Sequence, residues 1–150
     1  MSAAGMDPQA LAEASAAAMW NEDAASQRLG MAIEHIAPGA ATLSMTVRPD
    51  MSNGQGNCHG GYIFLLADSA FAFACNTHNL VTVAQHASIS FLEPVRIGDR
   101  LTAAAREVNR RGRSGIYDIR ITNQHGAHVA EFRGLSRTVR GTHVPADGPE

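Results

Sequence analysis

One carboxylate lies inside the most apolar stretch of the chain, directly after a loop of glycines. The segment from Gly56 to Asn76 reads GNCHGGYIFLLADSAFAFACN, and Asp68 is its only acidic residue. A carboxylate among apolar groups can act as a general base or as a nucleophile, and perturbed buried acids concentrate at functional sites. Gly60 and Gly61 leave bare backbone amides at the start of a predicted helix, where positive partial charge can hold a carbonyl oxygen during acyl transfer.

Simpler interpretations apply to the same residues. Asp68 would be a structural acid if a strand amide or an arginine satisfied its charge, because ion pairs also perturb buried carboxyl groups. Gly60 and Gly61 would only form a tight turn into the helix. The residue types alone leave these alternatives open.

The spacing of the two features has a geometric consequence. Gly60 and Asp68 are eight positions apart, which is roughly 12 Å along a helix. A base has to lie within about 3 Å of the group that it deprotonates, or reach it through one water. If both features are catalytic, a second copy of the helix has to run antiparallel beside the first, as in a two-fold dimer. The spacing then predicts a composite site with Asp68 of one chain and Gly60 of the other.

The cysteines and histidines do not predict a metal site. Cys58 and Cys75 are the only cysteines, and the sequence has no CxxC or HExxH motif. The one close pair is His125-x-x-His128. Zinc sites usually group their ligands more closely, so we expect no metal and no disulfide framework.

The helices and strands that position the candidate site are predicted from capping and helix-breaking residues and from the spacing of apolar residues. Asp7-Pro8 predicts an N-cap and a first helical proline, so a helix is expected from Pro8 to about Leu29, in one or two pieces, with Gly30 as its stop. Two strands are expected around the turn Pro38-Gly39.

The central segment predicts a long buried helix. Tyr62 to about His78 is apolar on nearly every side and too long for one strand. Such a helix should be enclosed by other structure. Four antiparallel strands are expected after it, separated by Gly- and Pro-containing turns, at about Thr82–Leu92, Arg100–Asn109, Ser114–Asn123 and Ala127–Thr138. The order favours one antiparallel sheet wrapped around the helix, an α+β fold.

Length and charge bound the remaining possibilities. The chain has 150 residues, 45% of them apolar, and a formal net charge of -2. These values fit one domain with an ordinary core and indicate neither a nucleic-acid nor a membrane partner. The N-terminus lacks the basic start of a signal peptide, and no apolar run reaches the roughly 18 residues of a membrane span. We expect a cytoplasmic protein with an N-terminal helical segment at 1–30, a main domain at 31–140 and a flexible tail at 141–150.

The segment NGQGNCHGGYIFLLADSAFAFACN resembles the signature of hotdog-fold acyl-CoA thioesterases, and most closely that of the phenylacetic-acid-degradation type. The likeness extends through FLEPVRIGDRLTAAA, SGIYDIRITNQHG and VAEFRGLSRTV, roughly Met31 to Val139. It implies a hotdog fold, in which a curved antiparallel sheet wraps a long central helix. It also implies homodimers with sites between subunits, assembled into tetramers.

The resemblance implies roles for individual residues. Asp68 matches the catalytic carboxylate, which either activates water or attacks the thioester through an anhydride. Gly60 matches the amide donor to the thioester oxygen, with His59 beside it and Gly61 next in the bare helix start. Asn53 matches the polar loop residue that helps to place the water or the carboxylate. The implied reaction is hydrolysis of an acyl-CoA to the free acid and coenzyme A, which is part of the substrate, so no separate cofactor is expected.

The residues that could bind the coenzyme A part and the acyl part of the substrate are less clearly indicated. Arginine suits phosphate groups, and the turn NRRGRSG offers Arg110, Arg111 and Arg113 to the coenzyme A phosphates, unless it is only a solvated hairpin tip. Four phenylalanines are candidates for an aromatic-acyl pocket or for ordinary core: Phe64, Phe71, Phe73 and Phe91. A phenylacetyl or hydroxyphenylacetyl group is what the resemblance implies, and other aromatic or medium-chain acyl groups are alternatives.

Two other functions compete with hydrolysis. A hotdog-fold enoyl-CoA hydratase or dehydratase needs a second proton-transfer group, and His59 would have to supply it. A non-catalytic acyl-CoA binding protein could lose the acid or carry a DNA-binding element. Asp68 is present, however, and Arg28 is the only basic residue before Met31.

Overall fold

The N-terminal region forms two helices, each capped by an aspartate. In the computed structural model, which describes residues 2–146, α1 (Pro8–Glu22) follows Asp7, whose carboxylate accepts a backbone amide of the first turn at 2.8 Å. Asp23 ends this helix and caps α2 (Ala24–Arg28) in the same way at 3.0 Å. Gly30 then reverses the chain with a φ of 70°. The predicted helix is thus confirmed, in two pieces.

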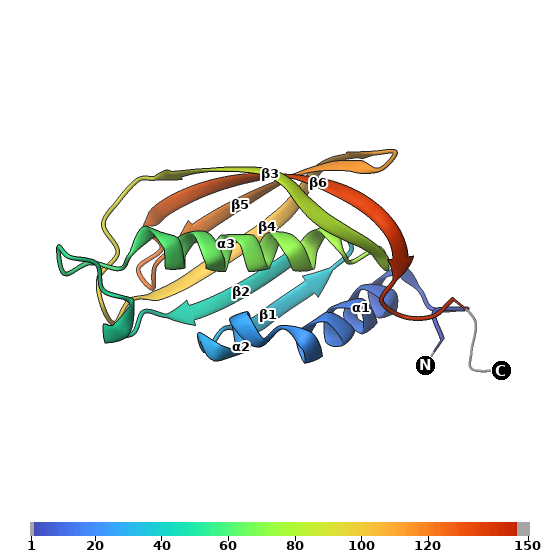
Figure 1. Cartoon of the computed structure of the whole chain (residues 1–150), viewed down its shortest axis with the longest axis horizontal. Helices are drawn as coiled ribbons and strands as arrows, with labels where there is room; N and C mark the ends of the chain where they lie inside the picture. Colours follow the sequence, from blue (N-terminus) through green and yellow to red (C-terminus); the bar gives the residue numbers. More distant parts are fainter. Residues whose placement is uncertain (1, 147–150) are drawn as a thin grey trace.

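Six antiparallel strands form one sheet in the order β1-β2-β4-β5-β6-β3. The strands are β1 (Ala32–Ala37), β2 (Ala40–Thr46), β3 (Leu80–Phe91), β4 (Arg100–Arg111), β5 (Ser114–Thr122) and β6 (His128–Thr142), and a short 3-10 helix, η1 (Pro49–Met51), follows β2. The sheet curves around α3 (Gly60–Cys75), and α1 lies beside β1 at one edge (Figure 1). The hotdog architecture expected from the sequence is confirmed.

The central helix begins at Gly60, at the glycines expected to form its start, but its predicted end was wrong. It ends at Cys75 rather than near His78, because the Asn76 side chain donates to the carbonyls of Ala72 and Thr82 and diverts the chain into a turn.

The last strand also runs further than predicted. β6 continues to Thr142 rather than ending at Thr138. Beyond it, the Asn79 carboxamide oxygen accepts the amides of His143 and Val144 at 3.1 and 2.8 Å. Residues 143 and 144, within the stretch predicted as a flexible tail, thus have hydrogen-bond partners in the main domain, and residues 147–150 of that stretch lie outside the described part.

The concave side of the sheet encloses α3 on all but one face. Most helix side chains are buried against the sheet, and Gly134 of β6 has no room for a Cβ, which would lie 2.7 Å from the Phe71 ring. The uncovered face consists of Gly61, Phe64, Leu65, Asp68 and Ala72. Within one protomer the enclosure expected for this helix is therefore incomplete on this face.

Within residues 2–146 no helix is long and apolar enough to cross a membrane.

Candidate active site

The start of α3 has one backbone amide without a partner. His59 is the N-cap, and its Nδ1 accepts the Gly61 amide at 2.9 Å. The Gly60 amide donates to no acceptor among the described residues. Because a helix N-terminus carries positive partial charge, this free N–H is suited to bind a carbonyl oxygen that gains negative charge.

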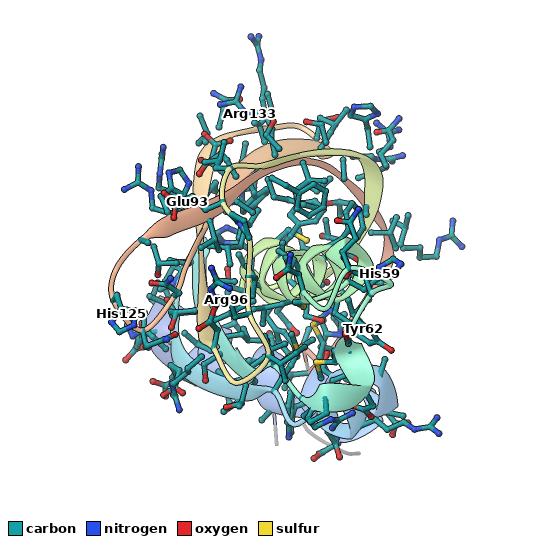
Figure 2. All side chains as sticks on the ribbon, turned by 90° about the vertical axis from the view of Figure 1, so that its left-hand side faces the viewer. His59, Tyr62, Glu93, Arg96, His125 and Arg133 are labelled. Atoms are coloured by element: carbon teal, nitrogen blue, oxygen red, sulfur yellow. The ribbon has the colours of Figure 1, made fainter. Side chains whose placement is uncertain are left out.

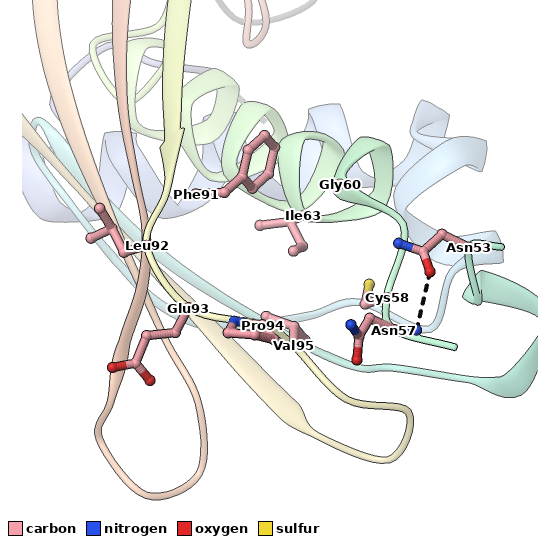
Figure 3. Close-up of a pocket in the computed structure, with 10 residues that line it drawn as sticks. All are labelled: Asn53, Asn57, Cys58, Gly60, Ile63, Phe91, Leu92, Glu93, Pro94 and Val95. Atoms are coloured by element: carbon pink, nitrogen blue, oxygen red, sulfur yellow. Dashed lines mark hydrogen bonds between the residues drawn. The ribbon is translucent and has the colours of Figure 1, made fainter. Parts of the chain in front are cut away.

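The loop before α3 is held rigidly beside that amide. The Asn53 side-chain oxygen accepts the amides of Gln55 and Asn57 at 2.9 and 3.1 Å, and the Cys58 amide donates to the Val95 carbonyl at 2.8 Å. Figure 3 shows the Asn53 bond to Asn57 as a dashed line. No residue among 2–146 accepts a hydrogen bond from the Asn53 side-chain nitrogen, so this nitrogen can donate to a bound group.

A cavity of about 390 Å³ opens at Gly60. Its lining combines the loop with the end of β3 and the segment after it: Asn53, Asn57, Cys58, Gly60, Ile63, Phe91, Leu92, Glu93, Pro94 and Val95 (Figure 3). Two predicted site residues, Asn53 and Gly60, are thus brought together. The cavity has an apolar wall on one side and carboxamides on the other, as a site for a small acyl group needs.

Asp68 lies elsewhere on the same helix. Its side chain is half-buried on the uncovered face of α3, and desolvation by burial raises its pKa. No described residue donates a hydrogen bond to the carboxylate or pairs with it as an ion. The structural interpretation, in which an amide or an arginine satisfies this acid, is therefore not supported within one protomer. Asp68 does not line the cavity at Gly60, as the helix spacing requires.

A second hollow lies on the uncovered face of α3. It has a volume of about 330 Å³ and is lined by His59, Gly61, Tyr62 and Leu65. The His59 and Tyr62 rings meet edge to face at 6.4 Å. Figure 2, which looks at the molecule from the left-hand end of Figure 1, shows both residues beside the helix, with Glu93 and Arg96 on the loop across its end. The site thus has two hollows that flank the free Gly60 amide.

The arginine hairpin lies far from Gly60 within one protomer. Ser114 at the hairpin pairs with Arg137, which in turn pairs with Val83 near the start of β3. Phe91, against Gly60, is eight residues further along that strand, roughly 26 Å away. Arg110 lies 3.8 Å from Glu107, so one cation of the hairpin has an acidic neighbour already.

The structure separates the four phenylalanines. Phe71 and Phe73 are core residues with 1% exposure, so they are not pocket candidates, because the sheet packs directly on them. Phe64 is 36% exposed on the uncovered face and packs edge to face on Phe132. Phe91 is 53% exposed and lines the cavity.

The segment from Leu92 to Val95 was not predicted as part of the site. The sequence carries little signal for it, because its place depends on the long-range bond between Val95 and the loop. Cys58 also lines the cavity, and burial raises the pKa of its thiol to about 11, so the thiol stays protonated near neutral pH and is a poor nucleophile. Within residues 2–146 no group of three or more His, Cys, Asp or Glu side chains could hold a metal ion.

Comparison with known proteins defines the class of this fold and site. Residues 55–130 match the Thioesterase superfamily, and the chain belongs to that family. The enzyme is therefore a hotdog-fold thioester hydrolase, which agrees with a free amide at a helix start beside an acyl-sized cavity.

Individual relatives narrow the class further. The chain is 46% identical over 125 residues to Acyl-coenzyme A thioesterase PaaI of Escherichia coli, covering 83% of this chain and 89% of that protein. The solved structure of E. coli PaaI, from the phenylacetic acid degradation operon, matches with a TM-score of 0.89 at 43% identity over 91% of this chain and 99% of that one. A Streptococcus mutans protein bound to acetyl CoA matches with a TM-score of 0.71 at 25% identity, over 75% of this chain and 90% of that one. The chain is an acyl-CoA thioesterase of the PaaI type.

Proposed function

We propose that this thioesterase hydrolyses aromatic acyl-CoA thioesters, with phenylacetyl-CoA or hydroxyphenylacetyl-CoA as the substrate, at a site that two protomers share. One observation carries the proposal: the free Gly60 amide and the unpaired Asp68 carboxylate lie on one helix, too far apart to act on one carbonyl. The origin of E. coli PaaI in a phenylacetic acid degradation operon supports the choice of acyl group.

The exposed apolar surface favours a second copy of the chain as the partner. Among the described residues seven large apolar side chains are exposed; besides Phe91, which lines the cavity, four of them lie on α3, on β3 or directly after β3: Phe64, Leu80, Val83 and Leu92. β3 is also an edge strand with unpaired backbone groups. An apolar patch beside a free strand edge is the surface on which another strand pairs. A two-fold dimer through β3 would extend the sheet and cover the open face of α3.

The helix spacing fixes the register of that dimer. If Asp68 of one protomer faces Gly60 of the other, the two antiparallel helices cross at the position halfway between them, Phe64. Phe64 is on the uncovered face, so it would meet its own copy at the two-fold axis. The same axis would make two identical sites.

The chemistry follows from these positions. The thioester oxygen accepts a hydrogen bond from the Gly60 amide, which stabilises the charge that develops on it. As a general base, Asp68 of the partner subunit takes a proton from water, the water oxygen attacks the carbonyl carbon, and the C–S bond breaks to release the coenzyme A thiolate. As a nucleophile, the same carboxylate displaces the thiolate and forms an anhydride that water then hydrolyses. Both routes need Asp68 ionised.

The flanking residues have supporting roles in this proposal. The Asn53 amide nitrogen donates to the attacking water or to the carboxylate. His59 acts through its backbone position and through its cap on Gly61, so its Nδ1 is not available as the second proton-transfer group that a hydratase needs. The thioesterase reaction requires no such group.

The arginine hairpin can reach the substrate only across the dimer. It lies at the end of the protomer opposite Gly60, and an antiparallel arrangement brings that end of one protomer beside the helix start of the other. Arg110, Arg111 and Arg113 would then contact the coenzyme A phosphates of the neighbouring site. Assembly of two such dimers into a tetramer and a cytoplasmic location complete the proposal.

A substrate panel tests the proposed specificity. We expect kcat/KM for phenylacetyl-CoA and 4-hydroxyphenylacetyl-CoA to exceed that for hexanoyl-CoA by about tenfold. Contacts between aromatic rings in the cavity stabilise the bound acyl group by an energy that corresponds to a factor of about this size. Release of the coenzyme A thiol gives the rate, and hydration of crotonyl-CoA, followed by loss of enoyl absorbance, should stay at background. A higher kcat/KM for hexanoyl-CoA than for both aromatic thioesters would contradict the proposed acyl group.

A further inference from the structure

Phe91 stands out because its ring lies against the residue that binds the thioester oxygen. A Cβ added to Gly60 would lie 3.0 Å from Phe91 Cζ and 3.2 Å from Cε1. The ring therefore occupies the space directly beside the free amide. A carbonyl that is bound to this amide has one of its substituents next to the ring.

The direction of the side chain follows from the strand pattern. Ala87 faces the helix opposite Gly134, against which Phe71 packs, and Ile89 faces it opposite Phe132. Because side chains alternate along a strand, Phe91 points to the same side. Figure 3 shows its ring between the end of the strand and the first turn of α3. Phe91 therefore faces the cavity rather than the outer surface of the sheet.

The ring is the largest part of one apolar wall. Ile63 lies beside the ring, and the carboxamides of Asn53 and Asn57 lie on the other side of the cavity (Figure 3). Phe91 remains 53% exposed although it is a large apolar side chain. An exposed aromatic face in a cavity is free to stack on a planar group.

We propose that Phe91 is the specificity-determining residue for the acyl group: its ring packs on an aromatic acyl chain while the Gly60 amide holds the carbonyl. This inference rests on the proposed function, since it assumes that the thioester binds at Gly60. In this proposal the acyl group occupies the cavity at Gly60, which Phe91 lines.

The test compares two thioesters on three variants. Phe91→Leu keeps an apolar side chain and removes the ring, and Phe91→Tyr keeps the ring. Val139→Ala is the control, because Val139 is a comparably exposed apolar residue (45%) that is not among the cavity-lining residues. The measured quantity is the ratio of kcat/KM for phenylacetyl-CoA to kcat/KM for hexanoyl-CoA, together with the inhibition constant of free coenzyme A.

Phe91→Leu is expected to lower this ratio about three- to tenfold relative to wild type, because the interaction energy of two aromatic rings corresponds to a factor in this range. Phe91→Tyr and Val139→Ala should keep the wild-type ratio, and inhibition by coenzyme A should be the same in all four proteins. If Phe91→Leu slows both thioesters equally, or changes only the inhibition constant of coenzyme A, the inference is wrong. Neither result would touch the proposed roles of Asp68 and Gly60, which depend on variants of those residues.

Discussion

Replacement of Asp68 by asparagine is expected to lower kcat/KM by at least about a hundredfold, the usual contribution of a positioned general base or nucleophile. Asparagine has the same shape but cannot accept a proton from water or displace a thiolate. The carboxylate has no hydrogen-bonding or ionic partner among the described residues. The substitution therefore breaks no hydrogen bond or ion pair among the described residues, and the loss should appear in turnover.

The same variant should be at least as stable as the wild type. Burial raises the pKa of Asp68, so folding disfavours its charged form. A carboxyl whose pKa is higher in the folded state costs stability above that pKa, and the cost disappears as pH falls and the group is protonated. Asparagine removes the cost, so the melting temperature at neutral pH should be unchanged or higher. For the wild type, activity should fall on the acid side at a pH above the ordinary aspartate pKa.

A matched acid provides the control for this variant. Asp50 is exposed on η1 and pairs with Arg48 at 3.0 Å. Asp50→Asn should keep turnover close to wild type, since an exposed pair of this kind contributes little. Near-normal turnover of Asp68→Asn would contradict the catalytic assignment. So would a melting temperature that falls in step with its activity, since that would give Asp68 a structural role.

Replacement of Gly60 by proline is expected to lower kcat by about a hundredfold to a thousandfold, as loss of one oxyanion donor does in other enzymes. Proline removes the N–H while fitting the first position of a helix, where that N–H has no helical partner. The preceding residue, His59, has an extended ψ of 131°, which is the conformation that proline favours before it. The variant therefore deletes the donor at small cost to the helix backbone, and its Cβ meets the Phe91 ring as the Cβ of alanine does.

Gly60→Ala distinguishes the effect of losing the amide donor from the effect of steric crowding at this position. Alanine keeps the N–H but places a methyl group against the Phe91 ring, which has to shift. We expect this variant to lose less than about tenfold in kcat, because a flexible ring can move while a missing donor cannot be replaced. Equal losses for the alanine and proline variants, with circular dichroism showing both folded, would show that steric crowding, and not the amide, matters at this position.

The sequence predicted the fold well because its signals are local. Asp7, Pro8 and Gly30 mark the ends of the N-terminal helices, and the glycine loop followed by an apolar run marks the start of α3. The wrong end of α3 depends on the Asn76 side chain, whose bonds the sequence pattern does not reveal. The chain beyond the predicted end of β6 is held by contacts between distant residues, the Asn79 bonds to His143 and Val144.

The candidate site was predictable only in part, for the same physical reason. Asn53, His59, Gly60 and Asp68 are close in sequence and form a recognisable pattern. Phe91 and Val95 join the site through β3 and through the Val95 bond to the loop, and their local sequence does not distinguish them from core residues. Conversely, Phe71 is an aromatic residue of the type that lines acyl pockets, but it packs against Gly134 in the core. Contacts between residues that are distant in sequence decide whether such a residue belongs to the site or to the core.

The proposed active site is built from two chains, and mixing two inactive variants tests this arrangement most directly. Asp68→Asn and Gly60→Pro are unfolded together in equal amounts, refolded, and assayed beside each variant refolded alone. A site that takes its acid from one chain and its amide from the other is intact in about a quarter of cases after random pairing, so about a quarter of wild-type activity should return. If the refolded mixture is no more active than the two variants alone, the acid and the amide act within one chain, and the shared site is contradicted.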